Sequence, residues 1–390
     1  MASTQRPQPA DEGNAMPGSV RLLRLFGFDI LIHWSWLIIA TLFTWSLAIG
    51  YLPDVYPAWD AGQRWVAAAI TSLLFFSSVL VHELSHSVVA RRRGLDVTSI
   101  TLFVFGGVSS LGGEPRSARD EFWIAVVGPL TSFALAVVFG AVWLVARDQD
   151  TPGIAAVTGY LAFINVALGA FNLLPGFPLD GGRVLRSALW GAGGNMLAAT
   201  RTAATAGKVV AGVLIGVGLL SVFAGMFGGL WTAVIGWFLW NAADSSYQQQ
   251  LVVNSLQGLT AGALAQRSDL RVPPNLTLQQ FADQYVLTHQ QRAFFVGPEG
   301  GEAQGMITLT DLSRAPREAW GGTSVFRAMT PRERLITVTP RTPAAEALQM
   351  MAEHNINQLP ILDGRDVTGL LTRAALIRAI QYRAAMKPDA

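Results

Sequence analysis

Apolar runs long enough to cross a bilayer recur through the first two thirds of this 390-residue chain, and they restrict its fold more than any other feature. A spanning helix needs about 20 mainly apolar residues. We predict six spans, the last short enough to be only partly inserted, at residues 28–51, 65–90, 122–145, 154–174, 209–226 and 230–242. With 51% hydrophobic and only 14% charged residues, we expect a polytopic α-helical membrane protein rather than a soluble enzyme.

The distribution of basic residues predicts the orientation of these spans in the membrane. Most of them fall on one side of the predicted spans, namely Arg21, Arg24, Arg91, Arg92, Arg93, Arg116, Arg119, Arg183, Arg186, Arg201 and Lys208, against Arg64 and Arg147 on the other side. Because basic flanks stay in the cytoplasm, we expect a multi-pass cell-membrane protein with both termini cytoplasmic. The arginines are scattered and the net charge is only +2, so nucleic acid is not an expected partner.

Two segments outside the spans carry their own signals. Residues 1–20 are rich in Pro, Gly, Ser and Gln without apolar periodicity, which predicts a mobile tail. Residues 95–111 are rich in β-branched side chains but are broken by Gly106–Gly107, so they are too short to span. We expect a re-entrant β-hairpin, because such backbone is tolerated at membrane depth only when it is buried in protein or lines a wet cavity.

Metal-binding side chains stand inside the second predicted span. His82 and His86 are four residues apart, so a helix places both imidazoles on one face, within reach of one zinc ion, with Glu83 beside them as a candidate general base. Polar groups of this kind are costly in hydrocarbon, which makes a function the default hypothesis. The chain has no cysteine, so zinc must be held by His, Asp or Glu.

A second polar stretch follows the fourth span. It runs from Asn172 through Pro175 and Pro178 to Asp180, and its prolines and glycines end the helix while a carboxylate stays near its terminus. Both this stretch and the histidine motif fall on the cytoplasmic side of the predicted topology. Asn172 can donate a hydrogen bond to an oxyanion or simply cap its helix, and the sequence leaves both roles open.

The composition becomes that of a soluble protein near residue 248, and the segment repeats itself at a spacing of about 65 residues. In each copy a short strand precedes a helix, a strand pair follows, and a second helix closes the unit. We therefore predict three parts: the tail at 1–20, a transmembrane domain at 21–247, and an α/β tandem at 248–390 with repeats near 258–316 and 322–386.

The order of these motifs resembles the site-2 protease family of intramembrane zinc metalloproteases, in the branch that carries a pair of cystathionine β-synthase (CBS) domains. The resemblance implies His82, His86 and Asp180 as ligands of one Zn²⁺ and Glu83 as the catalytic base. It also implies strand pairing between the segment after Gly106–Gly107 and the substrate, although a purely structural hairpin is the alternative. The third predicted span contains a Gly-Pro pair, Gly128–Pro129. Relatives often carry Asn shortly after this pair, where this chain has Thr131–Ser132.

CBS pairs commonly bind adenine nucleotides through a Thr or Ser and an Asp spaced three apart. Thr308 and Asp311 match that spacing, whereas Thr372 and Ala375 do not, so the resemblance implies at most one site for ATP, ADP or AMP. A CBS pair can instead act as a homodimerisation module without a ligand.

Two functions remain at this stage. The first is an intramembrane zinc metalloendopeptidase that cuts single-span membrane substrates near the cytoplasmic face of the lipid bilayer, as in regulated intramembrane proteolysis. The alternative is a CBS-regulated membrane transporter or channel. Glu83 between the histidines and the carboxylate after the helix break favour the protease, because a transporter needs neither in that register.

Overall fold

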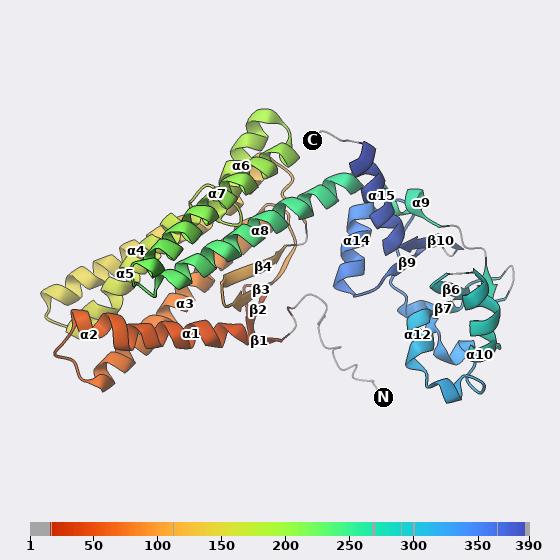
Figure 1. Cartoon of the computed structure of the whole chain (residues 1–390), viewed down its shortest axis with the longest axis horizontal. Helices are drawn as coiled ribbons and strands as arrows, with labels where there is room; N and C mark the ends of the chain where they lie inside the picture. The colour runs from red at the N-terminus through yellow and green to blue at the C-terminus, as the bar shows by residue number, and fades with distance from the viewer. Residues whose placement is uncertain are drawn as a thin grey trace, which may run out of the picture. The chain divides into compact units, whose positions relative to one another are not determined.

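The chain forms two compact units, one up to Gln250 and one from Leu251 onward. The computed structural model shown in Figure 1 describes residue 16 and residues 18–111, 113–266, 270–289, 291–298, 301–364 and 366–386. Most of the predicted N-terminal tail lies outside these residues.

Long helices make up most of the first unit. They are α1 (Ser35–Ser46), a π-helical turn η2 (Leu47–Tyr51), α2 (Leu52–Val55), α3 (Ala61–Arg92), α4 (Ala118–Asp148), α5 (Pro152–Asn172), α6 (Asp180–Gly193), α7 (Met196–Phe223) and α8 (Gly229–Leu256). Helix α3 starts at a capping box between Asp60 and Gln63, and its last turn carries Arg91 and Arg92, which suits the helix dipole. Helix α4 packs against α3, α5 and α6.

Five helical segments in the described part of the chain are long and apolar enough to cross a membrane. They are Ser35–Val55, Ala61–Arg92, Ala118–Asp148, Pro152–Asn172 and Met196–Phe223. Each overlaps one of the first five predicted spans. Helix α8 contains the sixth predicted run but is not among the five, so a sixth span stays a prediction.

The start of the first predicted span is wrong, because residues 28–33 form a strand. A four-stranded sheet, β1 to β4 in spatial order, consists of β1 (Ser19–Leu25), β2 (Phe28–His33), β3 (Val97–Phe103) and β4 (Gly106–Leu111). Strands β2 and β3 are parallel, and the other neighbouring pairs are antiparallel. Phe28 and Ile30 are fully buried, while Asp29 lies 3.6 Å from Arg21 in an ion pair. This alternation of apolar and charged residues suits a half-buried strand and not a lipid-facing helix.

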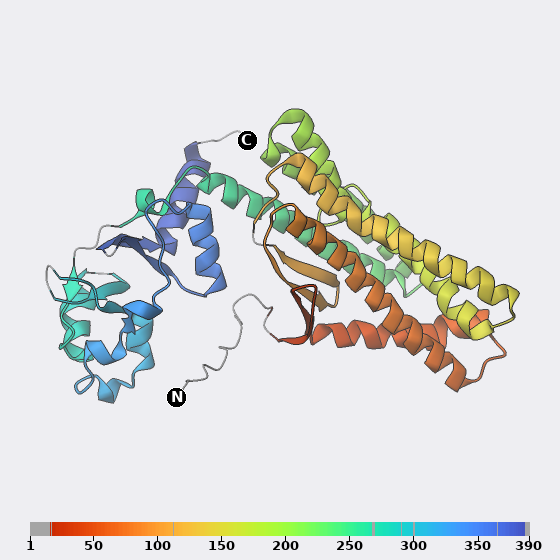
Figure 2. The ribbon, with the colours of Figure 1, turned by 180° about the vertical axis from the view of Figure 1, so that it is seen from behind.

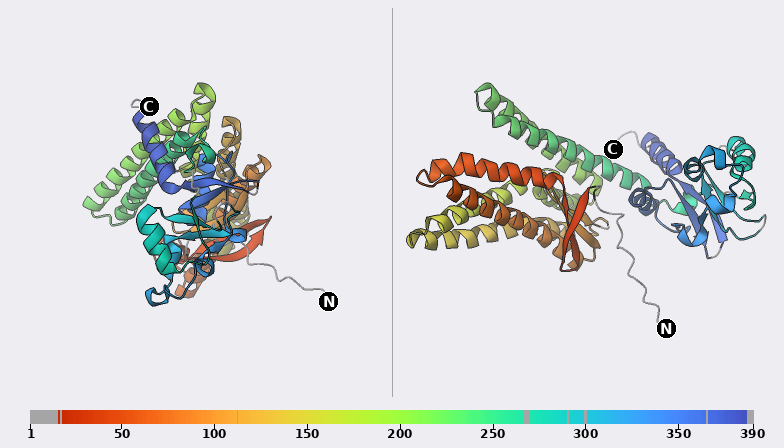
Figure 3. Two further views of the ribbon diagram at one scale, coloured as in Figure 1. Left: turned by 90° about the vertical axis from the view of Figure 1, so that its right-hand side faces the viewer. Right: turned by 90° about the horizontal axis from the view of Figure 1, so that it is seen from below.

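The predicted hairpin at 95–111 is present as β3 and β4. The sheet lies at the end of the helix bundle where α3 finishes (Figure 2 and Figure 3). Its inner face packs against α3 and α4 through a cluster that includes Phe28, Ile100, Leu84 and Ile124. In the order of the sheet β4 is an edge strand, so its outer side has no neighbouring strand among the described residues.

The second unit contains two similar halves. The first has β5 (Arg271–Val272) parallel to β6 (Ala293–Val296), which is antiparallel to β7 (Gly305–Thr308), and the second has a parallel bridge at Val338, β9 (Gln358–Asp363) and β10 (Asp366–Thr372). Their helices include α10 (Leu278–Phe281), α12 (Leu309–Arg314), α14 (Ala344–Glu353) and α15 (Arg373–Met386). A short strand β8 (Thr330–Pro331), just before the second half, pairs with β7 of the first. Gln266, before the first half, bridges to β10 of the second.

Candidate metal centre

Three potential metal ligands from two helices meet at one point in the first unit. His82 and His86 lie on α3, and Asp180 is the first residue of α6. The Oδ2 atom of Asp180 is 3.2 Å from the Nε2 atom of His82 and 3.2 Å from that of His86. The two Nε2 atoms are also 3.2 Å apart. The structure thus brings Asp180 next to two histidines that precede it by almost a hundred positions in the chain.

The outer nitrogen of each imidazole is held by helix α4. The Nδ1 atom of His86 donates to the carbonyl oxygen of Ile124 at 2.6 Å, which leaves the Nε2 lone pair of a neutral ring pointing at Asp180. The Nδ1 atom of His82 is 2.9 Å from the hydroxyl of Ser132, a fully buried residue. Partners of this kind set the tautomer and orientation of metal-binding histidines.

The geometry of these three atoms fits a zinc ion. Tetrahedral zinc with bonds of about 2.0–2.1 Å holds its ligand atoms about 3.3 Å apart, close to the separations observed here. The buried Oδ2 atom of Asp180 has no hydrogen-bond partner of good geometry despite its two close nitrogen neighbours. A cation at the centre of the triangle would satisfy all three atoms.

Glycines let the surrounding backbone come this close. A Cβ added at Gly128 of α4 would overlap the Nε2 atom of His86, and one added at Gly107 of β4 would overlap the Cγ atom of Glu83. Glu83 is therefore packed between its own helix and the edge strand. At these two positions the packing of the site requires glycine, because a side chain would overlap His86 or Glu83.

The loop between α5 and α6 delivers Asp180. Its backbone is tightly folded, with the amide of Leu179 donating to the carbonyl of Gly176 at 3.1 Å and a Cβ at Gly181 overlapping the carbonyl of Leu173. Helix α6 is anchored by a buried ion pair, in which Nε of Arg186 donates to Oε1 of Glu121 at 2.6 Å. Because Glu121 belongs to α4, one helix orients both the histidines and the helix of Asp180.

Among the described residues, no hydrogen bond joins Asn172 to the three ligand atoms of the triangle. Asn172 is the last residue of α5, and its side-chain amide donates to the carbonyl of Leu168 at 3.0 Å. One of its two amide hydrogens is used in this way, and the other is available for a further acceptor.

Ser132, Ile124, Arg186 and Glu121 were not predicted as site residues. The sequence did hold a signal for Ser132, since it stands where relatives of the family often have Asn, and the structure shows that its hydroxyl has a polar role there. The two arginines that follow Asp180 closely, Arg183 and Arg186, were a weaker signal for a buried acidic partner. The carbonyl of Ile124 could not have been found, because any residue has one.

In the second unit, Thr308 and Asp311 form a capping box at the start of α12. Oδ2 of Asp311 accepts from the amide of Thr308 at 2.9 Å and from its hydroxyl at 2.7 Å. The pair thus has a structural role at the turn from β7 to α12, and Asp311 remains partly accessible.

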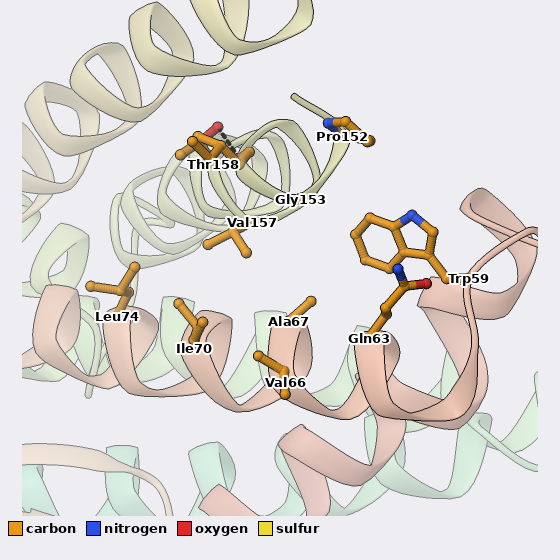
Figure 4. Close-up of a pocket in the computed structure, with 11 residues that line it drawn as sticks. Trp59, Gln63, Val66, Ala67, Ile70, Leu74, Pro152, Gly153, Val157 and Thr158 are labelled. Atoms are coloured by element: carbon orange, nitrogen blue, oxygen red, sulfur yellow. Dashed lines mark hydrogen bonds between the residues drawn. The ribbon is translucent and has the colours of Figure 1, made fainter. Parts of the chain in front are cut away.

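An apolar pocket of about 480 Å³ lies between α3 and α5 (Figure 4). Trp59, Gln63 and Pro152 are at one end and Leu74 at the other. Its lining has no titratable side chain, and Leu74, its nearest lining residue on α3, is two helical turns before His82. The pocket therefore offers no chemistry to the metal centre.

A zinc-competent triangle with an adjacent carboxylate, set among helices of membrane-spanning length, defines the class of intramembrane metalloproteases. The comparisons with known proteins agree. The model of Peptidase family M50 matches residues 70–149 and 140–217, and the CBS domain model matches residues 325–382. The chain belongs to peptidase family M50 and is a zinc metalloprotease with a CBS domain.

Individual relatives cover nearly the whole chain. Rip3 of Mycobacterium tuberculosis, which bears the name of a zinc metalloprotease, is 36% identical over 96% of this chain and 96% of its own. The similarly named sll0528 of Synechocystis is 33% identical over 96% of this chain and 98% of its own. A solved site-2 protease from Methanocaldococcus jannaschii is 29% identical, covers 59% of this chain and 95% of its own, and superposes with a TM-score of 0.42. Rip3 and sll0528 are both named zinc metalloproteases, which favours the protease over the transporter alternative.

Proposed function

We propose that the protein cuts single-span membrane proteins within the bilayer near its cytoplasmic face, with His82, His86 and Asp180 as the zinc ligands and Glu83 as the catalytic base. The observation that carries this proposal is the triangle of ligand atoms with 3.2 Å sides, beside the partly buried side chain of Glu83. Zinc, when bound, makes a water molecule more acidic and polarises a peptide carbonyl. Proton transfer and stabilisation of the intermediate are the work of the protein's own side chains.

Glu83 takes the proton of the attacking water and then gives it to the leaving amine. Its packing against Gly107 leaves the carboxyl group little freedom, so it is positioned before the substrate arrives. Asn172 would donate its second amide hydrogen to the oxygen of the tetrahedral intermediate, while the first stays bonded to the carbonyl of Leu168.

The edge strand β4 gives the substrate a place to bind. A transmembrane helix must unwind before its carbonyl can be attacked, and its freed amides and carbonyls then need new partners. The outer edge of β4 can provide them by strand addition. We place this hairpin at membrane depth, re-entering from the cytoplasmic side with the metal centre, because most basic residues and both termini fall on that side of the topology.

The second unit would regulate the first. We propose a tail at 1–20, a protease domain at 21–247 and a CBS pair at 248–390, in which Thr308 and Asp311 bind the phosphate and ribose of ATP, ADP or AMP. The capping box places both side chains at the strand-to-helix turn where such a ligand would be held. Homodimerisation through this unit is the competing role, and both are compatible with regulated intramembrane proteolysis.

Two variants test the catalytic assignment. Glu83→Gln should keep zinc and lose cleavage of a single-span substrate by about 10²–10⁴-fold, because the carboxamide cannot accept the proton. Asp180→Asn should lose zinc affinity as well as cleavage, since the neutral amide is a poor ligand. Zinc content by metal analysis and cleavage by gel assay separate the two. Normal cleavage by both variants would overturn the proposal.

A further inference from the structure

Strand β4 is attached to the catalytic helix at two points on one face. The backbone at Gly107 packs on the side chain of Glu83, and the hydroxyl of Ser109 lies 3.0 Å from the hydroxyl of Ser87. Gly107 and Ser109 are two apart in a strand, and Glu83 and Ser87 are four apart in a helix. Both spacings cover about 6–7 Å, so the strand and the helix match each other along this contact.

The direction of the hydrogen bond follows from the number of hydrogens. Ser87 is fully buried, and its hydroxyl donates to the carbonyl of Glu83 at 3.1 Å. A serine hydroxyl has one hydrogen, so Ser109 must donate to Ser87. The three groups form a chain from the edge strand to the backbone of the catalytic glutamate.

Other features leave the position of β4 weakly specified. Its ladder with β3 shifts register between Val97 and Ile100, and it begins with two glycines, Gly106 and Gly107. Glycine-rich strands are prone to slip, because few side chains fix their pairing. A polar bond to a rigid helix removes that freedom.

We propose that Ser87 and Ser109 are a positioning pair that sets which peptide bond of the substrate is cut. This inference rests on the proposed function, in which the substrate adds as a strand to β4. The register of β4 on α3 then determines which substrate carbonyl lies beside Glu83. Without the hydrogen bond between Ser87 and Ser109, β4 occupies neighbouring registers on α3 as well. A shift of β4 by two residues keeps the same face of the strand toward the helix.

The test maps cleavage sites by mass spectrometry. The full-length protein is reconstituted in vesicles with synthetic single-span peptides that carry a helix-weakening Asn-Gly pair at different depths. Wild-type protein should cut each responsive peptide at one bond. Ser109→Ala and Ser87→Ala should each release about a tenth to a quarter of the product from neighbouring bonds, given the modest net strength of one hydrogen bond. Zinc content should not change.

Two control variants separate positioning from general damage. Ser109→Thr keeps the hydroxyl and should restore a single cut. Ser77 is on the same helix, and among the described residues its exposed hydroxyl bonds only to the carbonyl of Leu73. Ser77→Ala should therefore behave as wild type. A single unshifted cut with unchanged KM in Ser109→Ala and Ser87→Ala would overturn the pair's role.

A second measurement, hydrogen exchange, tests the attachment of β4 without requiring proteolysis. Hydrogen exchange at the β4 amides should be faster in Ser109→Ala than in wild type or Ser77→Ala, because the strand is no longer held to α3. Equal exchange in all three proteins would also overturn the inference. If wild-type protein cuts none of the peptides, the proposed function fails, and the exchange experiment still decides whether the pair holds the strand.

Discussion

At the scale of single residues, the close approach of α4 to the histidines depends on Gly128. An added methyl group there would overlap the Nε2 atom of His86, so Gly128→Ala should push the ring away from Asp180. We expect zinc affinity to fall about tenfold or more, because a displaced ligand cannot complete the triangle. Competition with a chelator of known affinity measures the loss.

Gly140 is the matched control on the same helix. A Cβ added there would come no closer than 3.9 Å to a neighbour, the Cβ atom of Ala162, so Gly140→Ala should bind zinc as wild type does. Equal zinc affinity in Gly128→Ala and Gly140→Ala would show that the packing of α4 does not constrain His86.

At the scale of elements, the turn of the β3–β4 hairpin is tied to α8. The rings of Phe105 and Phe238 are stacked, with centroids 3.9 Å apart and planes 13° apart. Such a pair contributes about 0.5–1.5 kcal/mol beyond its buried area. Phe238→Ala should therefore loosen the hairpin and raise KM for a membrane substrate about three- to tenfold, with zinc content unchanged. Initial rates over a range of substrate densities in the bilayer give KM and kcat separately.

The neighbouring residue on α8 provides the comparison. Trp237 is 65% exposed, and its ring stacks on no other ring among the described residues, so Trp237→Ala removes an aromatic side chain and leaves the Phe105–Phe238 stack in place. A rise in KM in Trp237→Ala equal to that in Phe238→Ala would mean that the stack has no specific role.

At the scale of the whole molecule, the question is whether the second unit senses nucleotide. Asp311→Asn should keep the start of α12, because an amide oxygen can still accept from the backbone of Thr308. It should weaken adenine nucleotide binding about tenfold, because a charged acceptor for the ribose hydroxyls is lost. Calorimetry on the full chain with ATP, ADP and AMP measures this, with Asp363→Asn at the end of β9 as the control. Absence of heat with wild type would leave dimerisation as the simpler role.

Much of the architecture was predictable because its signals are local. The apolar runs, the helical spacing of His82 and His86, and the internal repeat near the C-terminus each depend only on residues close in the chain. The first span was started too early for the same reason. Residues 28–33 are largely apolar, but they form a strand between the antiparallel β1 and the parallel β3, which is about 70 positions later in the chain.

Local pattern was therefore sufficient for the family, and it supplied the candidate zinc ligands. It could not decide the site, because metal geometry depends on atoms from distant segments. Tertiary packing alone brings Asp180 within 3.2 Å of both imidazoles, supplies Ser132 and the carbonyl of Ile124 behind them, and lays β4 along Glu83. The physical reason is that a helix sets the spacing of its own side chains, whereas the distance between two elements depends on the side chains between them. Here Gly128 and Gly107 have no side chain, so α4 and β4 can approach His86 and Glu83 closely.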